Sequence, residues 1–178
     1  MQLASGKSIC SLGWILFGLL FGNQTSQASE CRAIRTKLDG STFFCSASPG
    51  GLCADGTIRS GILKGTKLAV YTAAAPSAGL PGVESPLVLS YTADAVFTTK
   101  HGELHLSQLG VSDPLRQVFT ELSRVVGGTG RFYQASGDLF ISGTLSIDGT
   151  DFESDITGTV CLTDSIEDDD EDSRDDDD

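Results

Sequence analysis

The sequence has few residues of the kinds that bind nucleic acids. Lysine and arginine together number 12 in 178 residues, against 24 acidic residues. Eleven acids and one arginine give residues 164–178 a net charge of −10, so the rest of the chain carries only −2 of the total −12. A surface that binds phosphate backbones needs clustered positive charge. We therefore expect no nucleic-acid partner and a nearly neutral globular part.

Long apolar runs are equally scarce. The only one, Ser11 to Gly22, has about twelve residues, whereas a membrane-spanning helix needs about 20. It follows Lys7 and precedes Ser26 and Ala28, which occupy the −3 and −1 positions of a cleavage site. This pattern is typical of a secretory signal peptide. We predict a signal peptide over residues 1–28, no membrane span, and export to the periplasm or the extracellular space.

Only five cysteines are present, and Cys10 lies in the predicted signal peptide. An even set of four in an exported chain predicts two disulfides, for which three connectivities are open. No two cysteines have CxxC spacing and none lies beside a histidine, so metal binding and redox catalysis are weaker interpretations. The favoured pairs are Cys45–Cys53, across a short turn, and Cys31–Cys161, which would join the first and last strands of a closed barrel.

Helical periodicity is absent after the signal peptide. Short β-branched and apolar runs are instead separated by turn residues, which is typical of sandwiches and barrels. We predict one all-β domain over residues 29–163, an antiparallel closed barrel of eight or nine strands. A disordered acidic tail is expected over residues 164–178, because its like charges repel. The expected strands are 33–38, 42–47, 57–63, 67–72, 87–99, 103–109, 118–126, 138–147 and a last one from residue 150.

Two of these strands have a clear inner face. In residues 87–99 the predicted inner face holds Leu87, Leu89, Tyr91, Ala93, Ala95 and Phe97. In residues 138–147 it holds Leu139, Ile141, Leu145 and Ile147. Asp148-Gly149 then predicts a two-residue hairpin turn. In that register Ile147 faces Thr150, Leu145 faces Phe152, Gly143 faces Ser154, Ile141 faces Ile156 and Leu139 faces Gly158; a slip of one residue would place acids in the core.

A glycine-rich stretch, Val125 to Leu145, begins with VVGGTGRFYQASG. A phosphate-binding loop requires a following helix, but here a strand pattern follows, so we interpret the glycines as a tight connection between strands. Residues 128–137 fit G-T-G-x-F-x-x-A-x-G, which resembles the signature turn of the dirigent and allene oxide cyclase-like barrels and of exported bacterial proteins with a GGTGRF turn. The resemblance implies an eight-stranded antiparallel barrel. It implies a structural role for Gly128, Gly130, Phe132 and Gly137, and it transfers no catalytic residue.

Candidate sites for chemistry are few. His101, Glu103 and His105 have the alternate spacing that would direct three ligands to one side of a strand. However, His101-Gly102 predicts a turn, and Leu104 and Leu106 define the inner face, so we predict no metal site. No G-x-S-x-G elbow is present, so no catalytic residue and no cofactor are predicted.

Residues 118–126 leave two orientations open. If Val118, Leu122 and Val126 face inward, Arg124 does so too and would need a partner or a ligand there. In that case Tyr91 and Arg124 are the candidate polar anchors of an apolar pocket. If Phe119 and Val125 face inward instead, Arg124 lies in solvent.

The expected role is a non-enzymatic binding or scaffold protein whose barrel, largely filled by side chains, takes an apolar small molecule. One alternative is an enzyme of the dirigent or cyclase type that steers a reactive intermediate inside the barrel. Another is an extracellular interaction protein that binds divalent cations weakly, or a basic surface, through its acidic tail.

Overall fold

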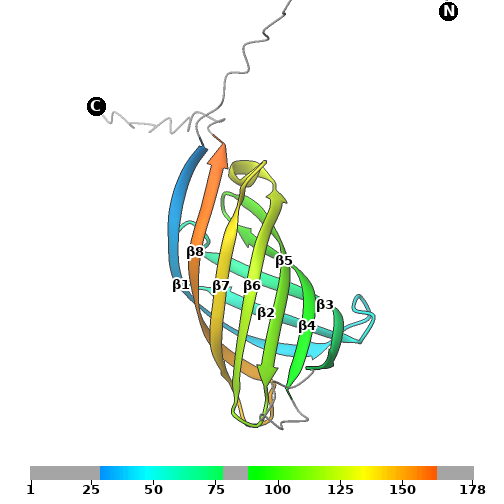
Figure 1. The fold of residues 1–178 in the computed structure, drawn as a ribbon. Helices are drawn as coiled ribbons and strands as arrows, with labels where there is room; N and C mark the ends of the chain where they lie inside the picture. Colours follow the sequence, from blue (N-terminus) through cyan, green and yellow to red (C-terminus); the bar gives the residue numbers. More distant parts are fainter. Residues whose placement is uncertain (1–28, 78–87, 164–178) are drawn as a thin grey trace, which may run out of the picture.

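A computed structural model describes residues 29–77 and 88–163. These residues form a closed antiparallel barrel of eight strands in which each strand pairs with its neighbour in sequence and β1 closes onto β8 (Figure 1). The strands are β1 (Ser29–Phe44), β2 (Leu52–Ile58), β3 (Gly65–Pro76), β4 (Leu89–Thr99), β5 (Gly102–Asp113), β6 (Val118–Gly128), β7 (Ser136–Leu145) and β8 (Asp151–Thr163). A short 3₁₀ turn, η1 (Gly130–Phe132), connects β6 to β7. The predicted antiparallel barrel is confirmed, with eight strands.

Both predicted disulfides are present. Cys31 and Cys161 face each other in the β1–β8 ladder and are bonded, so the disulfide joins the two strands that close the barrel. Cys45 and Cys53 are bonded across the connection between β1 and β2. Such bonds persist in oxidising compartments, so both are compatible with export.

The predicted hairpin register of β7 and β8 is confirmed from Leu139–Gly158 to Leu145–Phe152. The two-residue turn is wrong. The β7 strand ends at Leu145, and the amide of Gly149 donates to the carbonyl of Ser146. The turn therefore spans more residues, and Ile147, expected to face the core, is 91% exposed.

Two predicted strand boundaries are also wrong. Segment 33–38 and the first three residues of segment 42–47 belong to one strand, β1, which continues through Gly40, opposite Gly56 of β2, and ends at Phe44. The predicted strand 57–63 overlaps only the end of β2. The chain turns after Ile58, where the amide of Lys64 donates to the carbonyl of Gly61.

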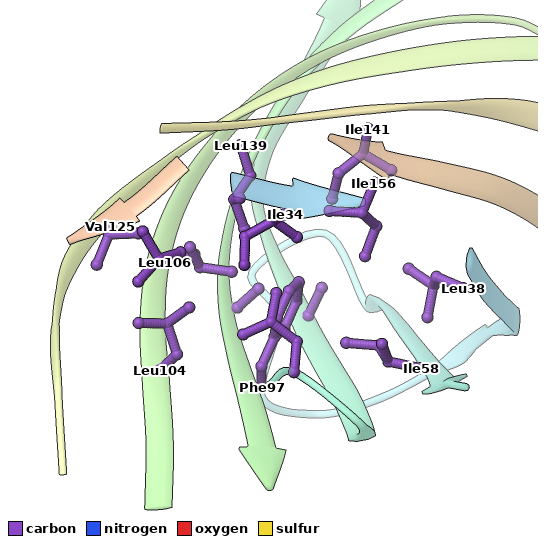
Figure 2. Packing of buried hydrophobic residues seen from close by; sticks show 14 of the residues in the cluster. Ile34, Leu38, Ile58, Phe97, Leu104, Leu106, Val125, Leu139, Ile141 and Ile156 are labelled. Atoms are coloured by element: carbon purple, nitrogen blue, oxygen red, sulfur yellow. The ribbon is translucent and has the colours of Figure 1, made fainter. Parts of the chain in front are cut away.

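Apolar side chains fill the barrel towards the end where β1 begins and β8 finishes. Figure 2 shows part of this cluster, contributed by strands all around the barrel: Ile34, Leu38, Ile58, Phe97, Leu104, Leu106, Val125, Leu139, Ile141 and Ile156. Phe132 of η1 is fully buried and joins the same cluster. We call this the packed end. The opposite end, where β1 finishes and β2 begins, is the cavity end.

The glycine-rich connection lies at the packed end. Gly130 has φ +56°, and a Cβ there would lie 2.4 Å from the carbonyl oxygen of His101. Gly128 ends β6, Phe132 is buried, and Gly137 has φ +139° in β7. At Gly130 the chain needs both a left-handed conformation and a close approach, for which only glycine is suited.

Candidate functional site

A cavity of about 250 Å³ opens at the cavity end of the barrel. Its wall is mainly apolar and comes from strands on every side, with Leu52, Ala54, Tyr71, Leu89, Phe119, Leu145 and Phe152 among its residues. The rings of Phe119 and Phe152 meet edge to face, with centroids 5.8 Å apart. The interior is thus filled at one end, as expected, and hollow at the other.

Three polar side chains of the wall, Lys67, Tyr91 and Glu121, are deeply buried. The Lys67 ammonium lies 3.1 Å from Oε2 of Glu121, and these two side chains are only 3% and 4% exposed. The hydroxyl of Tyr91 donates to Oε1 of the same carboxylate at 2.9 Å. A buried charge is costly unless it is paired and hydrogen-bonded. Here the carboxylate has both an ion-pair partner and a hydroxyl donor.

Gln108 and Ser123 extend this group into the interior. The side-chain amide of Gln108 donates to Oε2 of Glu121 at 3.2 Å and to the hydroxyl of Ser123 at 2.8 Å. The amide oxygen of Gln108 is buried and has no hydrogen-bond partner within the described part of the chain. We refer to Lys67, Tyr91, Gln108, Glu121 and Ser123 together as the polar cluster.

The backbone brings the polar cluster together from four adjacent strands, β3 to β6. Its residues occupy buried, inward-facing positions of their strands. Gly110 separates Tyr91 from Glu121 in the ladder, since it pairs with Tyr91 on one side and with Glu121 on the other. The absence of a side chain at Gly110 lets the Tyr91 ring lie across the strand and reach Glu121.

Two tyrosines of the wall remain neutral at physiological pH. Burial, followed by the charge of Glu121, raises the pKa of Tyr71 well above that of a free phenol. The same two causes raise the pKa of Tyr91 further, with smaller contributions from Tyr71 and from the hydrogen bond to Glu121. Their rings meet edge to face at 5.1 Å. Tyr91 therefore acts as a fixed hydrogen-bond donor to Glu121.

Of the two predicted polar anchors, only Tyr91 lies in the cavity. Phe119 and Val125 of β6 are buried, so the second of the two orientations considered for this strand is correct. The Arg124 side chain is 73% exposed on the outer face and pairs with Asp138 at 3.2 Å. The structure therefore does not bring Arg124 and Tyr91 together.

The histidine segment lies away from the cavity. His101 is in the turn before β5, and Nε2 of His105 lies 3.3 Å from the Glu103 carboxylate, both side chains being partly exposed. In residues 29–77 and 88–163, no group of three His, Cys, Asp or Glu residues is arranged to hold a metal ion. The same residues include no helix long and apolar enough to cross a membrane. The predicted signal peptide and acidic tail lie outside the described residues.

Sequence reasoning missed Lys67, Gln108, Glu121 and Ser123. In β6 the face that carries Val118, Leu122 and Val126 is the more apolar one, yet it points outward. Gln108 could have been found, because continuing the alternation of the buried Leu104 and Leu106 by one more step reaches it.

No family model, curated protein or solved structure matches the chain.

Proposed function

We propose that this protein binds a compact, largely apolar small molecule in the cavity end of its barrel. The observation that carries this proposal is the cavity of about 250 Å³, whose wall is mainly apolar and contains three buried polar residues. Ligand sites in proteins are typically apolar hollows with a few well-placed polar groups that orient the ligand. Eight-stranded barrels can hold one small ligand in this way.

The uneven filling of the interior supports the proposal. A void lined by apolar side chains forfeits contacts and lowers stability. The packed end shows that this chain can fill its barrel, since Leu38, Phe97 and Leu139 there are completely buried. A cavity kept opposite the packed end, beside a costly charged pair, favours a binding role over a purely structural one.

The proposal also covers the cellular location of the protein and its relationship to known barrels. We place the protein outside the cytoplasm, supported by the two disulfides and by the sequence of residues 1–28. We relate its barrel to the dirigent and allene oxide cyclase-like barrels, supported by the glycine pattern of residues 128–137 and by the eight antiparallel strands.

Thermal unfolding with a panel of compact apolar compounds tests the binding proposal. A ligand at about 100 times its Kd should stabilise the fold by about 2.7 kcal/mol. Ser112 lies in the cavity wall, so Ser112→Trp should fill the space and abolish this stabilisation. Ser107→Trp, on the outer face of the same strand, is the matched control. The proposal fails if no compound raises the Tm, or if the increase persists in Ser112→Trp.

A second candidate function is catalysis on the bound molecule. The observation that favours it is the convergence of Lys67, Tyr91 and Glu121 in the wall of one cavity, because such groups can move protons or stabilise charge. Glu121→Gln removes the charge while keeping the shape. An enzyme would convert a bound compound, as followed by mass spectrometry, and would lose that conversion in Glu121→Gln. A binding protein would return the compound unchanged in both.

A further inference from the structure

The residues of the polar cluster differ in how many further hydrogen bonds they can form. Glu121 already accepts hydrogen bonds from Lys67, Tyr91 and Gln108. Tyr91 donates its only hydroxyl hydrogen to Glu121, so it has no further donor. The Lys67 ammonium carries three N–H donors, and within the described part of the chain its side chain bonds only Glu121. Since Lys67 lines the cavity, the cluster has spare donors for a group that enters there.

The charges in the cavity wall are balanced. Lys67 contributes one positive charge and Glu121 one negative charge, while Tyr91 and Tyr71 are neutral phenols whose pKa burial raises further. Among the wall residues that the structure describes, no other is ionisable. An anionic ligand would add an uncompensated charge near Glu121, and a cationic ligand would add one near Lys67. Either is costly where water is excluded.

The size of the cavity limits the ligand further. An apolar cavity of about 150 Å³ can hold benzene, so about 250 Å³ suits a compact molecule somewhat larger than a single ring. Resting on the binding function proposed above, we infer that the ligand is a compact uncharged molecule with one hydrogen-bond-accepting oxygen, such as a carbonyl, which Lys67 holds while the apolar wall covers the rest.

Three probes of similar shape test this inference on the wild-type protein. They are p-menthane, a saturated hydrocarbon; menthone, the same skeleton with a ketone; and 4-isopropylcyclohexanecarboxylate, which carries a negative charge. Affinities are measured by thermal shift and by protein-detected NMR. A hydrogen bond from a charged donor predicts that menthone binds about tenfold or more tightly than p-menthane. The carboxylate should bind more weakly than menthone.

Variants then assign the preference to Lys67. In Lys67→Met the advantage of menthone over p-menthane should disappear. Because Lys67→Met leaves the Glu121 carboxylate unpaired, the double variant Lys67→Met/Glu121→Gln removes both charges and provides a second test. Arg124→Met, which removes a cation from the outer face, is the control and should keep the preference.

The outcomes separate this inference from the proposed function. Equal binding of menthone and p-menthane, tighter binding of the carboxylate, or a preference that survives in the double variant would overturn the role of Lys67 and leave a binding cavity. If none of the three probes binds while other compounds of the panel do, the inferred ligand class is overturned, whereas binding of no compound at all contradicts the binding function itself. The comparison among probes on the wild-type protein stands even if a variant does not fold.

Discussion

The hydroxyl of Tyr91 donates a hydrogen bond to Oε1 of Glu121 at 2.9 Å, and Gly110 lies between the two residues in the sheet. The contact joins β4 to β6 across β5, inside the barrel. It depends on the absence of a side chain at residue 110, since a Cβ there would lie 2.2 Å from the Tyr91 ring. The polar cluster therefore depends on Gly110 as well as on its charged residues.

Gly110→Ala should displace the Tyr91 ring and break its bond to Glu121. We expect a loss of about 1–3 kcal/mol in the free energy of unfolding, as for other overpacked interiors. Gly50→Ala is the control, because its Cβ would meet only the Ser48 hydroxyl at 3.9 Å and should change stability by less than about 0.5 kcal/mol. Urea unfolding measures both. Equal stability of the two variants would contradict the packing described.

Two ion pairs of this barrel differ mainly in burial. Lys67→Met should destabilise the fold by about 3–5 kcal/mol, because it leaves Glu121 charged and unpaired inside. Arg124→Met breaks an exposed pair with Asp138 and should cost less than about 1 kcal/mol. The double variant Lys67→Met/Glu121→Gln should recover part of the first loss. Chemical denaturation gives all three values, and similar losses for both single variants would argue against a buried pair.

Alkaline pH should destabilise the barrel through Tyr91. Its pKa is raised in the folded state by burial and by Glu121, whereas in the unfolded chain it lies near 10. Below pH 10 both states keep the proton and stability is intact. Above pH 10 the unfolded state loses it first, so the free energy of unfolding should fall by about 1.4 kcal/mol per pH unit for this group.

Tyr91→Phe removes that contribution and should give a shallower decline above pH 10 in urea titrations at a series of pH values. Tyr71→Phe should act in the same direction, because burial also raises the pKa of Tyr71. Parallel declines in the wild type and in Tyr91→Phe would show that the Tyr91 hydroxyl is not buried beside a carboxylate.

The two disulfides should differ in their effect on stability. Cys31 and Cys161 are 130 residues apart, whereas Cys45 and Cys53 are 8 apart. Loop-closure entropy predicts stabilisation of about 5 kcal/mol for the longer loop and about 2.5 kcal/mol for the shorter one. Replacing each pair with alanine and measuring thermal unfolding tests this order. A larger loss from the 45/53 pair would mean that native-state contacts of that turn dominate.

The parts of the fold with one unambiguous pattern could be predicted from sequence. The β7–β8 register follows from the Asp148-Gly149 turn signal, and because a slip of one residue would put Asp151, Glu153 and Asp155 inside; all three are exposed. The inner face of β4 from Tyr91 to Phe97 was predicted for the same reason and is buried. The disulfides followed from a short turn and from barrel closure.

The candidate site was harder to predict because its residues break the usual rule of burial. Glu121 and Lys67 are charged, and such residues are rarely buried unless paired. The pairing joins positions 54 residues apart on different strands, which no local pattern encodes. In β6 the outer face is the more apolar one, so the sequence pattern did not indicate which face points inward. Arg124 was therefore considered as an anchor, and Glu121 of the same strand was not.

The most direct test of a binding function is native mass spectrometry of the mature protein purified from its own source, compared with Ser112→Trp produced in the same way. We expect an added mass on the wild-type protein that dissociates on denaturation, corresponds to a compact uncharged molecule and is absent from Ser112→Trp. A wild-type protein with only its bare mass, lowered by four hydrogens for the two disulfides, and no adduct after incubation with compact apolar compounds would contradict it.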